Sequence, residues 1–350
     1  MGRGSEGGPV TLRGIAERLG LDVSTVSRVL NGPPAERERA ASQETARRIR
    51  RLADELGYRP NPHAASLRTR RSNLIGVLFP QLSEIVVATI YEGIEAEATE
   101  RGLSTFVTNT HDDPALQRDR IGMVLARRVD GLIIGDAHLD GAALKGPELR
   151  DVPFVLVNRR SDLGGVSVTC DDRLGGRLVA EHFLALGHRH VAVVAGKPFA
   201  STGADRTAGF TERYREAGLP IPAERVSDSS FDIAGGRRAA LELLDRPDRP
   251  SALFAVNDFA AIGVAGAARD LGLTLGADLA LAGFNDTPLA AELPVALTSV
   301  RSPMTEQGRC AVRLLLRRIA GETPESRVLA PRLMVRTSSG DPVGPPLTSA

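Results

Sequence analysis

The 350-residue sequence lacks a long apolar run, a cysteine cluster and an abundance of lysine. No stretch approaches the roughly 20 apolar residues that span a bilayer, and no apolar segment marks a secretory signal near the amino terminus. The two cysteines, Cys170 and Cys310, have no CxxC spacing, which fits a reducing cytoplasm better than a disulfide scaffold. We therefore expect a cytoplasmic, nucleoid-associated protein without membrane contact, metal or cofactor.

Signatures of catalysis are also missing. No HExxH or Walker A pattern occurs, and the GxGxxG match at residues 2–7 has no preceding strand and no surrounding βαβ unit. The pair His188 and His190 has no cysteine or carboxylate nearby at ligand spacing, so a loop is a better interpretation than a metal site. These absences predict that the protein is not an enzyme.

Charge is distributed unevenly. Lys145 and Lys197 are the only lysines among 44 basic residues, and the net charge is +1. Residues 1–71 nevertheless hold 14 arginines and eight acidic residues, a local charge of +6 that leaves −5 for the remainder. A basic segment of this kind is typical of proteins that bind a phosphate backbone, although a solvated arginine-rich surface is the alternative.

The basic segment contains two short amphipathic helical patterns. Gly20 suits the left-handed residue that ends a helix, and Asp22 suits the N-cap of the next one. The outward face of the second helix carries Val23, Ser24, Ser27, Arg28 and Asn31. The pattern predicts a helix-turn-helix whose second helix enters a DNA groove, and an ordinary αα-hairpin is the alternative. A loop over 32–39 and a helix from Ser42 to about Leu56 follow.

The hydrophobic pattern of the sequence changes at Leu74. Short apolar runs alternate with longer helical patterns, and the alternation restarts after Asp171. Unbroken apolar strands between helices favour parallel sheets that are covered on both faces. The expected fold class is α/β, with an all-α helix-turn-helix headpiece followed by two doubly wound parallel-sheet lobes. Ligands of such lobes bind at the carboxyl ends of the strands, in the crevice between them.

These patterns divide the chain into three parts. We expect the helix-turn-helix domain over 10–60, a hinge helix and linker over 61–72, and a two-lobed core over 73–340. The amino-terminal lobe should comprise about 73–168 and 299–327, and the carboxy-terminal lobe about 169–298 and 328–340.

Several motifs occur together in a fixed order along this chain. They closely resemble the lactose/galactose repressor (LacI/GalR) family, and the resemblance spans residues 11 to about 337 in the segments 25–31, 56–61, 64–67, 75–77, 129–133, 186–189, 205–210, 257–258 and 283–286. The resemblance implies a bacterial transcription factor, dimeric or tetrameric, whose core is similar to periplasmic sugar-binding proteins. The tail beyond Arg336 has no leucine heptads, so we expect a homodimer.

The resemblance also implies which residues meet DNA. Val23, Ser24 and Arg28 would face base edges, with Arg28 able to reach guanine N7 and O6 through two parallel hydrogen bonds. Ser27, Asn31 and Thr45 would contact phosphates, which position the domain. In the hinge, Leu67 would insert between base steps, Ala64 would permit close approach, and Asn61 would add a contact. The alternatives are a packed Val23 and a Leu67 that covers the core.

An effector cleft is implied between the two lobes. Its expected lining is Val86, Val87, Arg159, Thr202, Arg206, Phe231, Asp258 and Asn285. Arg206 and Asp258 suit vicinal hydroxyl groups, and Phe231 offers a flat apolar face to a sugar ring. Other interpretations stay open: Asp258 caps a helix, Phe231 belongs to the lobe core, or Arg206 pairs with Asp205 or another acid on the surface.

The expected function is therefore a sequence-specific DNA-binding regulator, a repressor, acting on a pseudo-palindromic double-stranded operator. Its operator affinity would be controlled by a small molecule, a sugar, bound between the lobes. Two alternatives remain: a sugar-binding protein without a DNA role, and a repressor that responds to a non-sugar effector such as a nucleobase.

Overall fold

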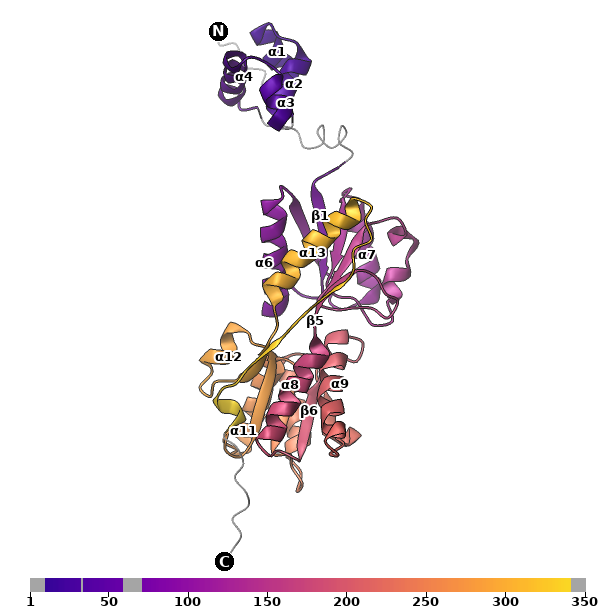
Figure 1. Ribbon diagram of the computed structural model, residues 1–350, viewed down its shortest axis with the longest axis vertical. Coiled ribbons are helices and arrows are strands. Elements are labelled where there is room, and N and C mark those ends of the chain that lie inside the picture. The colour runs from indigo at the N-terminus through magenta and orange to yellow at the C-terminus, as the bar shows by residue number, and fades with distance from the viewer. Residues whose placement is uncertain (1–9, 33, 59–70, 341–350) are drawn as a thin grey trace, which may run out of the picture. The chain divides into compact units, whose positions relative to one another are not determined.

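The computed structural model describes residues 10–32, 34–58 and 71–340, and the chain forms two compact units, Met1–Ser72 and Asn73–Ala350 (Figure 1). We refer to the first as the headpiece and to the second as the core. Every helix within the described ranges is too short or too polar to cross a membrane.

The described residues of the headpiece form the helices α1 (Leu12–Leu19), α2 (Val23–Asn31), α3 (Pro34–Arg39) and α4 (Gln43–Glu55). The caps read from the sequence are confirmed: Gly20 has φ of +64°, Asp22 accepts a 2.7 Å hydrogen bond from the Ser24 amide, and Ser42 caps α4. One helical face from each of α1, α2 and α4 is buried in a small apolar core of Ile15, Ala16, Val26, Val29, Ala46, Ile49 and Ala53.

The expected loop over 32–39 is wrong, because residues Pro34–Arg39 form the helix α3. Proline is favourable at the first position of a helix, where no backbone donor is required, and the following Ala, Glu and Arg residues are good helix formers.

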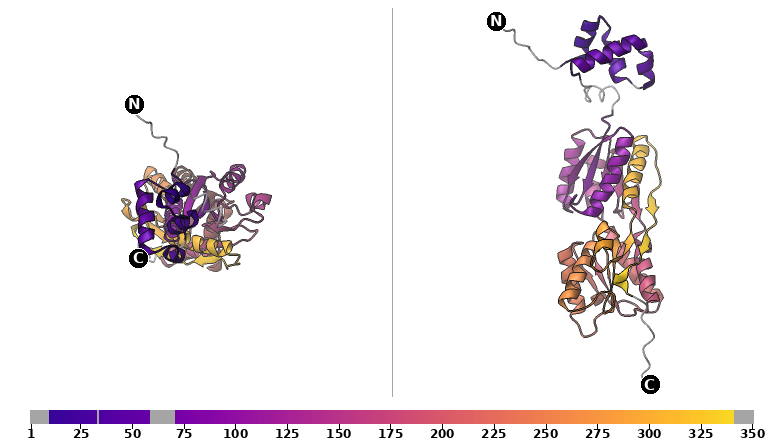
Figure 2. Two further views of the ribbon diagram at one scale, coloured as in Figure 1. Left: turned by 90° about the horizontal axis from the view of Figure 1, so that it is seen from above. Right: turned by 90° about the vertical axis from the view of Figure 1, so that its left-hand side faces the viewer.

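The amino-terminal lobe of the core contains a six-stranded sheet in the order β11-β5-β4-β3-β1-β2, in which all neighbours are parallel. Helices α6 (Ile85–Glu100) and α13 (Met304–Ile319) pack side by side on one face, and α7 (Pro114–Leu125) covers the other (Figures 1 and 2). The strands are β1 (Leu74–Phe79), β2 (Ser104–Asn109), β3 (Gly131–Ile134), β4 (Phe154–Val157), β5 (Ser167–Cys170) and β11 (Arg327–Leu329).

The carboxy-terminal lobe repeats this plan with the strand order β12-β10-β9-β8-β6-β7, and only the β10–β12 pair is antiparallel. Helices α8 (Asp172–Ala185) and α9 (Ser201–Glu216) cover one face, and α10 (Ile233–Leu244) and α11 (Asp258–Asp270) the other. The remaining elements are β6 (Val191–Ala195), β7 (Val226–Asp228), β8 (Ala252–Ala255), β9 (Ala280–Asn285), β10 (Thr298–Arg301), β12 (Arg332–Met334) and α12 (Pro288–Glu292).

Three strands depart from the expected organisation. The strands β5, β10 and β11 are short and contain polar residues, so they are not among the unbroken apolar runs that predict strands in this sequence. The chain crosses between the lobes directly after each of them. Residues 169–170 and 328–329 therefore belong to the amino-terminal sheet and 299–301 to the carboxy-terminal sheet, which moves each expected lobe boundary by a few residues.

Candidate functional site: a recognition helix and an interlobe cleft

Helix α2 of the headpiece presents three side chains on one exposed surface. Val23 is 40% exposed, so it does not pack in the headpiece core, and Ser24 and Arg28 are exposed beside it. The Arg28 guanidinium folds along the helix, where Nε donates to the Ser24 carbonyl at 3.2 Å and Nη2 to the Ser24 hydroxyl at 3.0 Å. All three residues expected to read bases thus share a surface that a DNA groove can reach.

The residues expected to contact phosphates belong to two helices, Ser27 and Asn31 to α2 and Thr45 to α4. Ser27 is half-buried, and the Asn31 amide donates to the Tyr58 hydroxyl at 3.3 Å, which links α2 to the chain after α4. The Thr45 hydroxyl accepts from the Ser42 hydroxyl at 2.9 Å at the start of α4. The expected hinge contacts, Asn61, Ala64 and Leu67, lie outside the described residues.

Within the core, the carboxyl ends of strands from both lobes enclose a cavity of about 40 Å³. Seven of the eight residues expected at the effector site line it: Val86, Val87, Arg159, Thr202, Arg206, Phe231 and Asn285. Pockets for drug-sized ligands commonly measure several hundred Å³, so a ligand of that size requires the walls of this cavity to move apart.

Some residues that line the cavity have an uncommon backbone conformation. Asn158, Phe231 and Asn285 all line it with positive φ angles of 66°, 65° and 102°. A side-chain-bearing residue in this conformation costs about 1–3 kcal/mol and persists where the surroundings hold it, commonly at ligand sites. The strain at Phe231 is the most informative, since a bulky aromatic residue rarely adopts a left-handed conformation.

Phe231 is held by its neighbours rather than by its own conformational preference. Its amide donates to the Ser229 hydroxyl at 3.3 Å, and its carbonyl accepts from the Asn257 side chain at 2.7 Å. The ring lies against Gly196 and Gly203, where an added Cβ would come within 2.1 Å and 3.0 Å of ring atoms. The two glycines thus make room for an aromatic face that also borders the cavity.

Arg206 is almost completely buried, with 3% of its surface exposed. Its Nε donates to Asp172 Oδ1 at 2.8 Å, its Nη1 donates to the Val256 carbonyl at 2.8 Å, and its guanidinium stacks 3.8 Å from the Phe284 ring centroid. The surface pairing with Asp205 is therefore not observed. Burial raises the pKa of Asp172 to about 6, and the adjacent Arg206 opposes that shift.

Two polar atoms beside the cavity have spare hydrogen-bonding capacity. Arg159 is paired through Nη1 with Asp112 Oδ1 at 2.6 Å, but its buried Nε has no hydrogen-bond partner within the described parts of the chain. The buried Asn285 Oδ1 likewise has none there. A buried donor and a buried acceptor left without partners are costly, so a ligand that satisfies both gains affinity.

Comparisons with known proteins agree with both parts of this description. Residues 11–61 match the family model for bacterial regulatory proteins of the lacI family, and residues 180–339 match the periplasmic binding protein-like domain. The HTH-type transcriptional regulator DegA of Bacillus subtilis (strain 168) is 31% identical over 335 residues, which cover 94% of this chain and 98% of DegA. The chain belongs to the LacI family.

Solved structures of LacI-family proteins have the same architecture. The Lac repressor dimer bound to operator and the anti-inducer ONPF matches with a TM-score of 0.86 and 28% identity, over 95% of this chain and 100% of that one. The transcriptional regulator CelR in complex with cellobiose matches with a TM-score of 0.71 and 29% identity, over 94% and 99%. This LacI-family chain is accordingly a DNA-binding transcriptional repressor with an effector-binding core, and not an enzyme.

Asp258 is the one residue predicted at the effector site of this LacI-family protein that lies elsewhere. It does not line the cavity; its carboxylate is 1% exposed and accepts from the Thr287 amide at 2.7 Å and the Ser299 hydroxyl at 2.6 Å. The N-cap of α11 is Asn257, whose Oδ1 accepts from the Ala260 amide at 2.8 Å. Burial raises the pKa of Asp258 to about 6. Asp258 thus connects the segment after Asn285, through Thr287, to the neighbouring strand β10, through Ser299.

The sequence analysis missed four residues of the lining, Pro80, Glu84, Asn158 and Asn257. Pro80, Asn158 and Asn257 follow β1, β4 and β8 within two residues. The rule that ligands meet the carboxyl ends of parallel strands could have identified these three positions. Glu84 directly precedes α6 and had no comparable signal.

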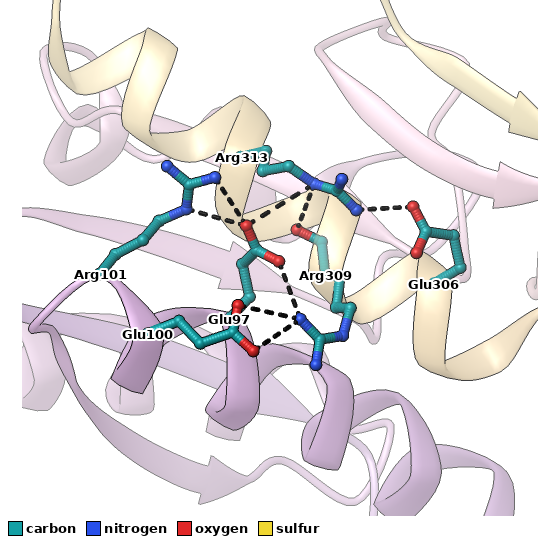
Figure 3. Close-up of polar contacts among 6 residues, drawn as sticks. All are labelled: Glu97, Glu100, Arg101, Glu306, Arg309 and Arg313. Atoms are coloured by element: carbon teal, nitrogen blue, oxygen red, sulfur yellow. Dashed lines mark hydrogen bonds and ion pairs between the residues drawn. The ribbon is translucent and has the colours of Figure 1, made fainter.

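A second charged cluster of this LacI-family core lies within the amino-terminal lobe (Figure 3). Glu97 of α6 is 5% exposed and meets Arg101 at 2.8 Å, Arg309 at 3.2 Å and Arg313 at 3.8 Å. Arg309 also pairs with Glu100, and Arg313 with Glu306. We call these six residues the Glu97 cluster. It joins α6 to α13 and contains three acids and three bases.

Proposed function

We propose that this repressor responds to a neutral, hydroxyl-rich small molecule, a sugar, bound in the interlobe cleft. The charge balance of the lining supports this choice. The two guanidinium groups at the cavity, Arg159 and Arg206, are each paired with a buried carboxylate, Asp112 or Asp172. Glu84 adds a further acidic group. Little positive charge is left to compensate a phosphate or a dicarboxylate.

The observation that carries the proposal is the juxtaposition of Phe231 with spare hydrogen-bonding atoms. Its face suits the apolar face of a sugar ring, and Arg159 Nε and Asn285 Oδ1 suit a hydroxyl acceptor and a hydroxyl donor. The similarity to CelR, solved as a cellobiose complex, is consistent with this chemistry. A nucleobase would use the same aromatic face, so it is the alternative to test.

A thermal-shift screen of the purified full-length protein tests the effector class. Monosaccharides and disaccharides form one arm, and nucleobases and nucleosides the other. A ligand present at 100 times its Kd stabilises the folded state by about 2.7 kcal/mol, which raises Tm by several degrees. A hit should lose its effect in Phe231→Ala and keep it in the surface variant Arg177→Gln. Stabilisation by nucleobases alone would reject the sugar.

The hit must then alter operator binding, because effector and DNA are linked through the same protein. A ligand that binds two lobe arrangements with different affinity shifts their populations, and DNA must change ligand affinity by the same factor. Operator titrations with and without the hit should therefore differ. Equal affinities would make the molecule a bound ligand without a regulatory role.

We further propose that Arg28 carries most of the direct base reading, since Val23 and Ser24 discriminate weakly. Arg28→Ala should cost about 1–3 kcal/mol of operator binding and relax the preference at one base pair. Arg48→Ala on α4, which removes another exposed arginine, is the control and should lower affinity without changing preference. A binding-site selection with Arg28→Ala that returned the wild-type preference would reject this assignment.

The proposed oligomer is a homodimer on a pseudo-palindromic operator. The Lac repressor match is a dimer, and the carboxy-terminal lobe of this chain carries an apolar groove between α11 and the segment after α12, lined in part by Ile262, Leu273, Leu293 and Val295. A second copy of the chain would cover this groove. Ile262→Glu should lower the mass in sedimentation equilibrium from dimer to monomer, and an unchanged mass would exclude the groove from the interface.

A further inference from the structure

The two lobes contact each other directly at a site beside the effector cavity. Residues that follow β2, β3 and β4 of the amino-terminal lobe meet the segment between β6 and the first turns of α9 in the carboxy-terminal lobe. The chain crosses between lobes next to β5, β10 and β11, whereas β6 is separated from β10 by two strands. In the carboxy-terminal lobe these contacts therefore lie away from the crossing at β10, and in the amino-terminal lobe they extend from β4, beside the crossing strand β5, to β2 at the far edge of the sheet.

The first element of this contact is aromatic and backbone-mediated. The rings of His138 and Phe199 stack with centroids 4.1 Å apart and an interplanar angle of 19°. The Leu139 amide donates to the Phe199 carbonyl at 2.9 Å, and the Arg160 amide donates to the Ser201 hydroxyl at 3.0 Å. Such contacts require close approach and fixed orientation, so they exist only when the lobes are together.

The second element consists of two ion pairs across the cleft. Arg160 forms a two-pronged pair with Asp205, with Nε and Nη2 at 3.1 Å and 3.0 Å from the two carboxylate oxygens. Lys197 Nζ lies 2.8 Å from Asp112 Oδ2. Two parallel hydrogen bonds give the Arg160 pair a geometric specificity that a single contact lacks.

Asp112 connects this interlobe contact to the effector cavity. One of its oxygens accepts from Arg159, which lines the cavity, and the other accepts from Lys197 of the opposite lobe. Its carboxylate is 7% exposed, and both His111 and Asp112 have positive φ, at 55° and 58°. Consecutive residues in this conformation are strained, so the turn is held by its surroundings.

We propose that His138, Arg160, Lys197, Phe199 and Asp205 form a latch that holds the cleft closed independently of the effector, and that Asp112 is a positioning residue coupling the latch to Arg159. The latch sets the fraction of molecules that are closed before a ligand binds. A ligand that binds the open and closed arrangements with different affinity then has an apparent affinity that depends on this fraction. Only this consequence for affinity rests on the proposed effector function; the closure itself does not.

Closure can be measured without any effector, in the full-length chain. Spin labels at Arg118→Cys on α7 and Arg215→Cys on α9 place one exposed probe on each lobe. Cys310→Ser removes the half-buried native thiol, and the buried Cys170, whose pKa burial raises to about 12, stays unlabelled. Pulsed electron–electron distance measurements then report the populations of closed and open molecules.

Arg160→Gln should lower the ratio of closed to open molecules about two- to fivefold, as expected for one partly exposed ion pair. Combining it with Lys197→Gln and Phe199→Ala should lower the ratio about tenfold or more. Arg177→Gln is the matched control, because Arg177 also pairs with two carboxylates and has the same 41% side-chain exposure, but all its partners lie in one lobe. It should leave the distances unchanged.

Two further variants keep the proposal testable if a single substitution perturbs folding. The exchange Arg160→Asp with Asp205→Arg should recover closure that either change alone loses. Asp112→Asn removes the charge but keeps a residue that tolerates positive φ, so it should open the cleft, and no such opening should follow from Asp113→Asn next to it. Identical distance distributions in the wild type and the triple variant would overturn the latch.

Discussion

Two of the clusters of arginine and acid in the core differ in how completely their hydrogen-bonding groups are paired. The Glu97 cluster sits within one lobe, and each of its arginines is paired with a carboxylate of the cluster (Figure 3). The cleft residues come from both lobes and leave Arg159 Nε and Asn285 Oδ1 without partners within the described chain. A dense set of charges therefore marks a ligand site only when part of its hydrogen-bonding capacity is unused.

Packing around the two clusters shows the same contrast. Near Glu97, the helices α6 and α13 approach so closely that a Cβ on Gly93 or Gly308 would come within 2.2 Å of a backbone oxygen of the other helix. Around the cleft, the backbone is strained at Asn158, Phe231 and Asn285. Close packing of α6 against α13 stabilises a single arrangement of these two helices. Strained backbone at the ends of strands is instead typical of sites that bind a ligand.

The largest effect should follow from breaking the buried ion pair at the cleft. Arg206→Met leaves Asp172 buried without a cation, which should lower the free energy of unfolding by about 3–5 kcal/mol and abolish effector binding. Urea unfolding and the thermal-shift assay measure the two losses. The double variant Arg206→Met with Asp172→Leu should regain most of the stability but no effector response. Regained binding in the double variant would contradict a ligand role for Arg206.

The second effect concerns the Glu97 cluster. Glu97→Gln removes the charge that three arginines share, but these arginines are 32–45% exposed and can turn to water. We therefore expect a loss of only about 1–2 kcal/mol in the free energy of unfolding. Effector affinity and operator preference should stay at wild-type values. A changed effector affinity with intact folding would mean that this cluster, too, takes part in regulation.

How much of the structure the sequence could predict depends on how far apart along the chain the interacting residues lie. Gly20 and Asp22 cap helices that they directly adjoin, so the ends of the headpiece helices could be predicted from local sequence. Seven residues that line the cavity were instead predicted from family resemblance. Asp258 was placed by resemblance at the cavity, yet its carboxylate bonds to Thr287 and Ser299, 29 and 41 positions away. Pairing over such separations depends on tertiary packing that residue patterns do not contain.

The third effect separates ligand contact from stability at the cleft. Phe231→Ala should weaken the effector identified in the screen about tenfold, or about 1.4 kcal/mol, through loss of the aromatic face. Stability should fall by less than in Arg206→Met, because the ring is only partly buried against the lobe core and its removal leaves no charge unpaired. Isothermal titration and urea unfolding of the same preparation give both values. A large loss of stability with unchanged effector affinity would show that Phe231 is a residue of the lobe core and not a ligand contact.

The smallest effect is a difference in pH dependence between the two clusters. Burial works against ionisation of Glu97, but the hydrogen bonds and charges of Arg101, Arg309 and Arg313 prevail and lower its pKa. The stability that Glu97 contributes is therefore present above its unfolded pKa and is lost as the pH falls through its lowered folded value. The destabilisation caused by Glu97→Gln should accordingly be full at pH 7 and fade below about pH 4.

Asp258, behind the cleft, should behave in the opposite way. Burial raises its pKa to about 6 from an ordinary value of 3.8, so the folded state binds the additional proton between these values. Its contribution to stability then grows as the pH falls from 7 to 5, and Asp258→Asn should remove that growth. Urea midpoints of the wild type and both variants at pH 7, at pH 5 and below about pH 4 measure the contrast. Parallel pH profiles in the two variants would show that Asp258 is held ionised, like Glu97, and that the two environments do not differ in this respect.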